Sequence, residues 1–115
     1  MILMMCARQR PLMVFFAPPQ VWDAESGKEN CTLRGHSGEV SDCRFLSSNV
    51  IASTARDGTV KLWDIQRGKC ITTFYGLPMC TVAVSPDSQL LAAGDSAGGV
   101  YILQAPKAKL EAKRC

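Results

Sequence analysis

Short apolar runs separated by turn residues recur along this chain. Val50–Ala55 is apolar and β-prone, and a second apolar run, Val60–Trp63, follows the turn Arg56–Gly58. Further along, apolar residues alternate from Met79 to Val84 before another apolar run begins at Leu90. The pattern predicts an all-β chain with strands over residues 30–34, 40–45, 50–55, 59–63, 69–74, 80–85, 89–94 and 99–103.

Four polar or half-polar side chains within these runs are able to form one series of hydrogen bonds. They are His36, Ser53, Asp57 and Trp63. An indole N–H, a hydroxyl, an imidazole and a carboxylate can each donate to the next. A buried polar group without a partner costs about 1–3 kcal/mol, so such a set is stable only when it is complete.

These residues carry a family resemblance: residues 33–64 resemble a WD40 repeat, one unit of a β-propeller. The Gly35-His36 opening, Ser53, the Asp57-Gly58 turn and the Trp63-Asp64 close stand in family order and at family spacing. The resemblance implies a four-stranded antiparallel blade. It also implies that His36, Ser53, Asp57 and Trp63 form a buried structural tetrad.

The repeat recurs at a period of about 40 residues, as a four-stranded blade requires. Val21-Trp22-Asp23 precedes the Trp63-Asp64 close, and residues 81–104 repeat the unit downstream. We therefore expect a partial propeller of about two blades, too few to close a ring. Its repeats divide into the end of one repeat, a complete repeat and a degenerate repeat, at residues 21–34, 35–74 and 75–104.

The degenerate repeat lacks the whole polar set. Aligned on the complete repeat, its corresponding residues are Tyr75, Ala93, Ala97 and Leu103. Joint loss is physically reasonable, because losing one member alone would leave the others without partners. The ending of this repeat resembles, more loosely, the last repeats of propellers attached to NACHT/STAND-type signalling ATPases.

The two flanks do not follow the repeat. Residues 1–20 hold Pro18 and Pro19 where a blade would place a strand, so we expect a foreign, disordered segment of the kind an alternative start would add. A targeting role for this segment stays open, although its apolar run is short for a signal peptide or a membrane span. Residues 105–115 form a basic, solvated tail. The net charge of +3 comes largely from this tail, without the motif that nucleic-acid binding would need.

Six cysteines and one histidine make a zinc cluster unlikely, since no Cys-x-x-Cys pair occurs. Cys43 and Cys70 stand where small apolar strand residues belong, so we expect buried free thiols. Disulfides remain an alternative. Free thiols fit a reducing compartment, which predicts a cytoplasmic protein, with the nucleus left open.

Catalysis is not expected, although His36, Ser53 and Asp57 offer the residue types of a hydrolase triad. A serine bonded to an indole N–H has no open face for substrate, and no nucleophile-elbow glycines flank Ser53. The sequence holds no phosphate loop or metal-binding motif, so we expect no cofactor and no metal.

The expected function is a non-enzymatic protein-interaction module, a WD-repeat scaffold fragment. Glu39, Ser41 and Arg56 match the family's recurring contact positions and are the candidate partner-binding residues. Expected partners are proteins or peptides, the remaining blades of a parent propeller or another chain, with nucleic acid unlikely and no membrane. Two alternatives stay open: the sensing or closing repeats of a NACHT/STAND-type ATPase, and a truncated isoform without independent function.

Overall fold

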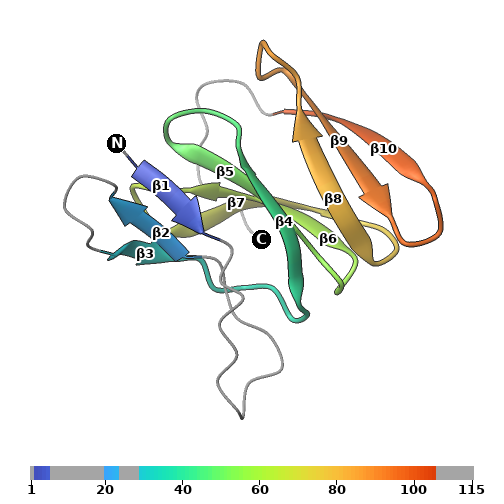
Figure 1. Cartoon of the computed structure of the whole chain (residues 1–115), viewed down its shortest axis with the longest axis horizontal. Helices are drawn as coiled ribbons and strands as arrows, with labels where there is room; N and C mark the ends of the chain where they lie inside the picture. Colours follow the sequence, from blue (N-terminus) through green and yellow to red (C-terminus); the bar gives the residue numbers. More distant parts are fainter. Residues whose placement is uncertain (1, 6–19, 24–28, 106–115) are drawn as a thin grey trace.

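The computed structural model describes residues 2–5, 20–23 and 29–105. Ten strands and no helix lie within these residues, so they contain no helix able to cross a membrane. Figure 1 shows three antiparallel sheets that follow one another across the molecule in chain order. The strands are β1 (Ile2–Met5), β2 (Gln20–Asp23), β3 (Glu29–Thr32), β4 (Val40–Phe45), β5 (Val50–Ala55), β6 (Thr59–Asp64), β7 (Lys69–Tyr75), β8 (Met79–Val84), β9 (Leu90–Asp95) and β10 (Val100–Gln104).

The middle sheet is a complete four-stranded antiparallel blade in the order β4-β5-β6-β7. The turn between β5 and β6 depends on Gly58, whose φ of 83° lies in the left-handed region. A Cβ at this position would also collide with the carbonyl oxygen of Gly76. Gly58 is therefore required both by the turn and by the neighbouring loop.

The last sheet, β8–β10, repeats the first three strands of the middle sheet in the order β10-β9-β8. Both sheets shift register at the same place, between Val40 and Asp42 in β4 and between Met79 and Thr81 in β8. A bulge preserved between two repeats is a feature of the fold, not an accident of one strand. The degenerate repeat thus keeps the backbone geometry of a blade without its polar set.

The first sheet has the order β1-β2-β3, and β2 carries Val21-Trp22-Asp23. Strand β1, Ile2–Met5, pairs antiparallel with β2. This differs from the expectation of a disordered segment over residues 1–20, because Ile2–Met5 form a strand and Gln20 begins β2. Residues 6–19, including Pro18 and Pro19, lie outside the described part of the chain.

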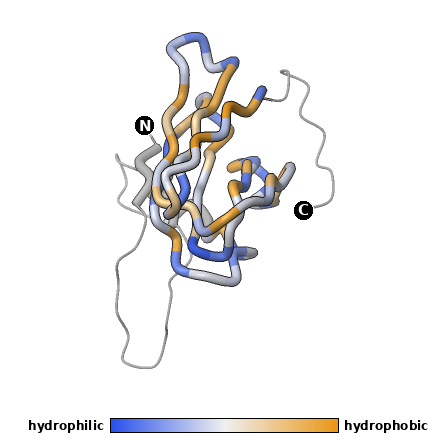
Figure 2. The backbone as a smooth tube through the Cα atoms, turned by 90° about the vertical axis from the view of Figure 1, so that its right-hand side faces the viewer, coloured by the Kyte–Doolittle hydropathy of each residue, from blue (hydrophilic) through white to orange (hydrophobic). Residues whose placement is uncertain are grey.

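The core lies on both faces of the two central strands of the middle sheet. Every residue of β5 and β6 is buried, so these strands show no alternation between core and solvent. Figure 2 shows hydrophobic residues along strands and hydrophilic residues in several of the turns. One cluster gathers around Trp63, with Leu33, Cys43, Ile51 and Ile65. On the opposite face, residues of the middle sheet such as Leu62 pack against Val82 and Leu91 of the last sheet.

Polar contacts join the middle and last sheets along β4 and β8. One carboxylate oxygen of Asp42 accepts hydrogen bonds from the hydroxyl of Thr81 at 2.9 Å and from the backbone N–H of Val82 at 3.0 Å. The hydroxyl of Ser41 donates to the carbonyl oxygen of Met79 at 2.8 Å. These bonds set the last sheet against the middle sheet, in addition to the apolar contact behind them.

The structure confirms the all-β class and the partial propeller. Strands β4 and β5 have the predicted bounds, and the other predicted strands differ by one or two residues. The largest difference lies at β3, which ends at Thr32 where the sequence predicts residue 34. The fourth strand of a second blade is not among the described residues, so the two blades described after β3 have four and three strands.

The cysteine prediction needs a correction. Cys43 and Cys70 are disulfide-bonded in the structure, where the sequence predicts buried free thiols. The prediction of free thiols rested on strand positions that suit small apolar residues, whereas a disulfide depends on sulfurs that approach in space. Cys80 is free and exposed on β8.

Candidate functional site

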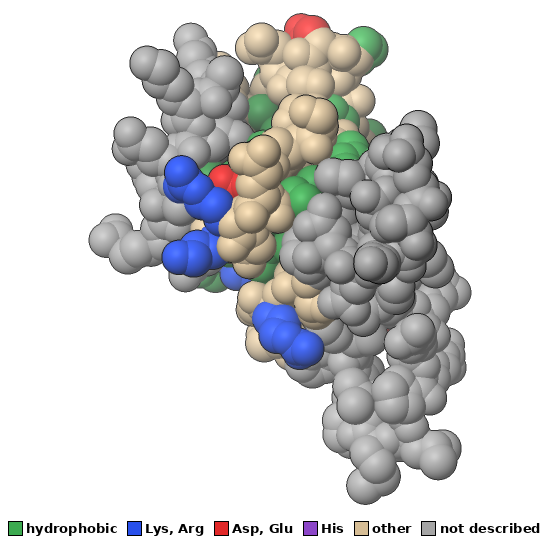
Figure 3. All heavy atoms as spheres, turned by 90° about the vertical axis from the view of Figure 1, so that its left-hand side faces the viewer, with side chains coloured by type: hydrophobic (Ala, Val, Ile, Leu, Met, Phe, Trp, Pro, Cys, Tyr) green, Lys and Arg blue, Asp and Glu red, His purple; other side chains and the backbone are tan. Residues whose placement is uncertain are grey.

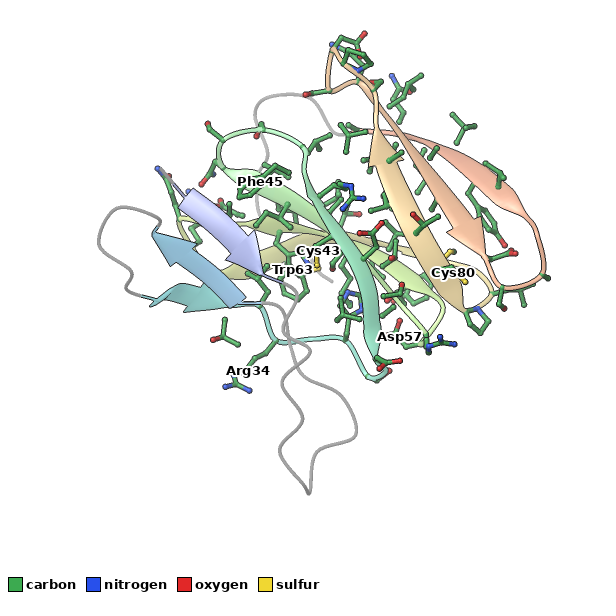
Figure 4. The ribbon with its side chains drawn as sticks, in the orientation of Figure 1. Arg34, Cys43, Phe45, Asp57, Trp63 and Cys80 are labelled. Carbon is green, nitrogen blue, oxygen red and sulfur yellow. The ribbon has the colours of Figure 1, made fainter. Side chains whose placement is uncertain are left out.

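The structure brings His36, Ser53, Asp57 and Trp63 together in one hydrogen-bond network. The indole Nε1–H of Trp63 donates to Ser53 Oγ at 2.8 Å, and Ser53 Oγ lies 2.6 Å from His36 Nε2. The other ring nitrogen, His36 Nδ1, lies 3.1 Å from Asp57 Oδ2. In Figure 4, Trp63 lies in the interior beside Cys43, whereas Asp57 lies at the end of the β5–β6 hairpin.

A fifth residue, Thr59, completes the network and was not singled out from the sequence. Its hydroxyl donates to Asp57 Oδ1 at 2.5 Å and lies 2.9 Å from His36 Nδ1. The backbone N–H of Thr59 donates to the same carboxylate oxygen at 3.0 Å. A threonine two residues after the turn aspartate is a local side-chain-to-backbone pattern, and it was the available sequence signal.

The donors and acceptors are consistent with a single direction of donation. Because Trp63 donates to Ser53, the serine hydroxyl is free to donate to His36 Nε2. The proton of a neutral imidazole then lies on Nδ1 and points toward Asp57. The Trp63 N–H, the Ser53 hydroxyl and both His36 ring nitrogens thus each have a hydrogen-bond partner. Buried polar groups are stable when they are paired in this way.

Burial, the largest influence, lowers the pKa of the His36 imidazole below its ordinary value of 6.5, against the raising effect of the Asp57 carboxylate. Burial alone would raise the pKa of Asp57. Hydrogen bonds from Thr59, the backbone N–H of Ser37 and His36 together outweigh burial, and the pKa lies below 3.8. The folded blade therefore holds a neutral imidazole against an ionised carboxylate at neutral pH.

This arrangement leaves no open serine for a substrate. Ser53 is 0% exposed and His36 is 8% exposed, and the hydroxyl of Ser53 is bonded on both sides. The residue types of a triad are present, but they lie inside a sheet and not in a cleft. No group of three or more potential metal-ligating residues occurs among the residues described.

The candidate partner-binding residues fall into two environments. Glu39 and Arg56 form an ion pair of 3.0 Å between Arg56 Nε and Glu39 Oε1, with side chains 58% and 63% exposed. Ser41 differs from the expected role, because its hydroxyl bonds Met79 and Thr54 at the contact between the middle and last sheets. The structure thus keeps Glu39 and Arg56 at the surface and uses Ser41 within the fold.

Two exposed apolar side chains lie at the β7–β8 end of the middle sheet, near the β5–β6 turn that carries Arg56. Tyr75, the last residue of β7, is 76% exposed, and Leu77, in the segment that joins β7 to β8, is 50% exposed. The backbone N–H of Gly76, between them, donates to the carbonyl oxygen of Gly58 at 2.7 Å, so this segment lies against the β5–β6 turn. We call Glu39, Arg56, Tyr75 and Leu77 the rim patch.

The degenerate repeat has its own polar arrangement in place of the missing set. Asp95 Oδ1 accepts hydrogen bonds from the backbone N–H groups of Ala97 at 2.9 Å and Gly99 at 2.7 Å, and the hydroxyl of Tyr101 donates to Asp95 Oδ2 at 2.9 Å. The bond from Gly99 is the largest of the influences that lower the pKa of Asp95. Asp95 therefore stabilises the β9–β10 hairpin, although the residue that aligns with Asp57 is Ala97.

The face shown in Figure 3 bears on nucleic-acid binding. Figure 3 shows the left-hand side of Figure 1, where the Lys and Arg side chains of the described residues lie in separate groups. A nucleic-acid surface would place such groups in a continuous patch with aromatic side chains.

Two known proteins are similar to this chain in sequence. The chain is 38% identical over 61 residues to protein tipD of Dictyostelium discoideum, covering 53% of this chain and 10% of that protein. It is 33% identical over 93 residues to autophagy-related protein 16 of Arabidopsis thaliana, covering 78% of this chain and 18% of that protein. The chain thus spans less than a fifth of the length of these relatives.

A solved structure is also similar. The computationally designed Ika4 protein superposes with a TM-score of 0.69 at 26% identity, over 78% of this chain and 56% of that chain. The model of the TEP-1 C-terminal beta-propeller family matches residues 36–105, which include the buried network, the rim patch and the whole last sheet. Since this match covers more than half of the chain, the protein belongs to the TEP-1 C-terminal beta-propeller family.

Proposed function

We propose that this protein is a non-enzymatic interaction module that binds a segment of a partner protein at the rim patch. The observation that carries the proposal is the exposure of Tyr75 at the end of β7 that lies against the β5–β6 turn, together with the exposed ion pair that Arg56 of this turn forms with Glu39. Aromatic residues and arginine are the side chains most often responsible for binding energy in protein interfaces. Membership of a propeller family supports the coarser statement that the module binds proteins.

The chemistry of the rim patch suggests the kind of segment that it binds. Tyr75 and Leu77 offer apolar area to an aromatic or aliphatic anchor. Arg56 and Glu39 each have further hydrogen-bonding capacity and can pair with an acidic and a basic residue that flank the anchor. The preferred partner is thus a short peptide or loop with one large apolar side chain between charges of opposite sign.

The test uses peptides selected from a random peptide phage library on the full 115-residue chain. Arg56→Ala and Tyr75→Ala are each expected to weaken the selected peptides by at least about tenfold, as a residue worth more than about 1.4 kcal/mol does. Lys69→Ala is the matched control, because Lys69 is exposed at the opposite end of β7 from Tyr75.

Two results would overturn the proposal. One is a set of selected peptides that bind the Arg56→Ala/Tyr75→Ala double variant as tightly as the parent. The other is a failure to select any phage-displayed peptide whose binding to the chain is reduced by the same peptide added free in solution. An exposed ion pair contributes little to stability, so loss of binding in Arg56→Ala reports recognition, provided that the melting temperature is unchanged.

The wider biological setting of this module is also a proposal. A WD-repeat scaffold is the interpretation that we favour, and the sensing or closing repeats of a NACHT/STAND-type signalling ATPase are the alternative, with a truncated isoform as a third case. The sequence of a longer parent transcript separates them, because an upstream nucleotide-binding domain would favour the ATPase and blades alone would favour the scaffold.

A further inference from the structure

Strand β10 has an open edge within the described part of the chain. In the last sheet β10 pairs with β9 on one side, whereas its counterpart in the middle sheet, β6, is paired on both sides, by β5 and β7. An unpaired edge presents backbone N–H and C=O groups that can pair with another chain.

Hydrogen bonds at the two ends of β10 identify the residues that point outward. The backbone N–H of Asp95 donates to the carbonyl oxygen of Gly99 at 2.9 Å, and the N–H of Ala105 donates to Gln89 at 2.8 Å. Antiparallel pairs alternate between bonded and non-bonded residues, so odd-numbered residues of β10 bond β9. The backbone groups of Val100, Ile102 and Gln104 therefore face the open edge.

The side chains of β10 do not protect this edge. Natural sheets protect an edge with charges, proline or a bulge, but β10 contains only Val100, Tyr101, Ile102, Leu103 and Gln104. The pairing of β10 with β9 also shows no register shift. By contrast, the β4–β5 and β8–β9 pairings each contain one. A regular, uncharged and β-prone edge is suited to adding a strand.

Exposed apolar side chains accompany the open edge. Val100 is 70% exposed and Ile102 is 66% exposed, although Val60 and Leu62, at the same places in the middle sheet, are both 0% exposed. Figure 1 shows β10 at the right-hand side of the molecule, at the far side of the last sheet from the middle sheet. The repeat thus supplies apolar residues of core type at a place where no described element covers them.

We propose that β10 pairs antiparallel with β10 of a second copy of this chain, about a two-fold axis at Ile102. This register places Ile102 opposite its own copy and Tyr101 opposite Leu103, which are apolar cross-strand pairs of the kind that stabilise sheets. No charged residue lies opposite a like charge, because β10 has none. The same surface serves both copies, as a two-fold dimer requires.

This interface is formed by β10, whereas no residue of the rim patch lies on β10, so the inference goes beyond the proposed function. The interface joins two last sheets into one six-stranded sheet, and each copy contributes its own Glu39, Arg56, Tyr75 and Leu77 to the dimer. Two rim patches in one dimer would bind a partner that carries two peptide segments with added avidity.

The experiment measures mass by light scattering during size-exclusion chromatography of the full chain over a range of concentrations. The parent is expected to reach the mass of two 12.5-kDa chains. Ile102→Lys and Ile102→Glu are each expected to raise the dimer dissociation constant by at least about tenfold, since like charges then lie opposite each other. An equimolar mixture of the two variants is expected to recover dimer, because opposite charges face across the axis.

The controls distinguish loss of strand pairing from misfolding and from a general effect of added charge. Ile102 is mostly exposed, so circular dichroism of both variants is expected to match the parent. Gln66→Lys and Gln66→Glu add the same charges at an exposed turn between β6 and β7 and are expected to leave the dimer intact. A parent that stays at single-chain mass, variants that remain dimeric, or a mixture that does not recover dimer would each overturn the proposal.

Discussion

Asp57 holds more of the blade's polar contacts than any other side chain of the network. Its carboxylate accepts from Ser37, from Thr59 and from His36, and its side chain is only 7% exposed. These contacts link the loop before β4 to the turn after β5. Asp57 therefore has a structural role, since its hydrogen bonds stabilise the blade.

Replacing Asp57 with alanine is expected to lower the free energy of unfolding by about 1–3 kcal/mol, because His36 and the Ser37 N–H lose their acceptor. Urea unfolding followed by circular dichroism measures this difference. Glu39→Ala is the matched control, since it removes a carboxylate of an exposed ion pair worth about 0–1 kcal/mol. Equal midpoints for Asp57→Ala and the parent would contradict the buried network.

The lowered pKa of His36 predicts a loss of stability in mild acid. The unfolded chain takes up a proton near the ordinary value of 6.5, whereas the folded imidazole takes it up only at lower pH. The unfolded state therefore binds more protons between these two pKa values, and stability falls as pH decreases through this window. The stability that the neutral His36 contributes is fully present above pH 6.5. The lowered pKa of Asp57 adds a further loss of stability only below about pH 4.

Because the chain has one histidine, this effect can be assigned to one residue. Urea midpoints at pH 7.5 and 5.5 are expected to differ for the parent and to converge for His36→Gln. Proton NMR of the folded parent gives an independent reading that needs no variant. An imidazole that titrates at or above 6.5 in the folded chain would refute a buried neutral His36.

At the scale of the strand and hairpin, the two repeats hold equivalent turns by different means. The complete repeat uses Asp57 and its partners across the loop before β4, whereas the degenerate repeat uses Asp95 within its own hairpin. Both turns contain a glycine in the left-handed region, Gly58 and Gly98, with φ of 83° and 87°. The backbone of the hairpin is thus preserved while its side-chain support has changed.

These two glycines make a matched pair for testing the turn. Gly98→Ala is expected to cost about 1–2 kcal/mol from the left-handed backbone alone, since nothing lies within 4 Å of its Cβ. Gly58→Ala is expected to cost clearly more, because its Cβ would also meet the carbonyl oxygen of Gly76. Thermal unfolding of both variants measures the difference. Equal losses would show that the loop from β7 to β8 does not lie against the β5–β6 turn.

At the scale of the whole molecule, the contact between blades depends on β4. Asp42 bonds the hydroxyl of Thr81 and the N–H of Val82, and Ser41 bonds Met79, so one strand of the middle sheet orients the next blade. Apolar packing lies behind these bonds, and it is not directional. The polar bonds therefore fix how the two blades lie relative to each other.

Asp42→Ala is expected to loosen the last sheet locally before it affects the middle sheet. Hydrogen exchange measured by NMR should show faster exchange at the Val82 N–H, by at least about tenfold, with little change at β5 and β6. Arg44→Ala is the control, because it removes only the exposed partner of the same aspartate. Uniformly faster exchange across both sheets would mean that the blades unfold as one unit.

The sequence alone was sufficient for the strands and for the repeat. Apolar runs and turn residues are local signals, so the bounds of β4 and β5 could be predicted and the other predicted strands lie within two residues. The residues of the buried network could also be named, because family spacing brings them to one place in a blade. Thr59 was missed since its contribution depends on how the turn aspartate is oriented.

Only the tertiary structure decided which side chains meet across repeats. Ser41 and Asp42 lie about 40 residues from their partners on β8, and no local period shows that they join two blades. The disulfide bonding of Cys43 and Cys70 and the exposure of Val100 and Ile102 likewise depend on what lies beside each strand in space. A repeated pattern determines the geometry of one blade, whereas neighbouring sheets determine whether an apolar position becomes core or surface.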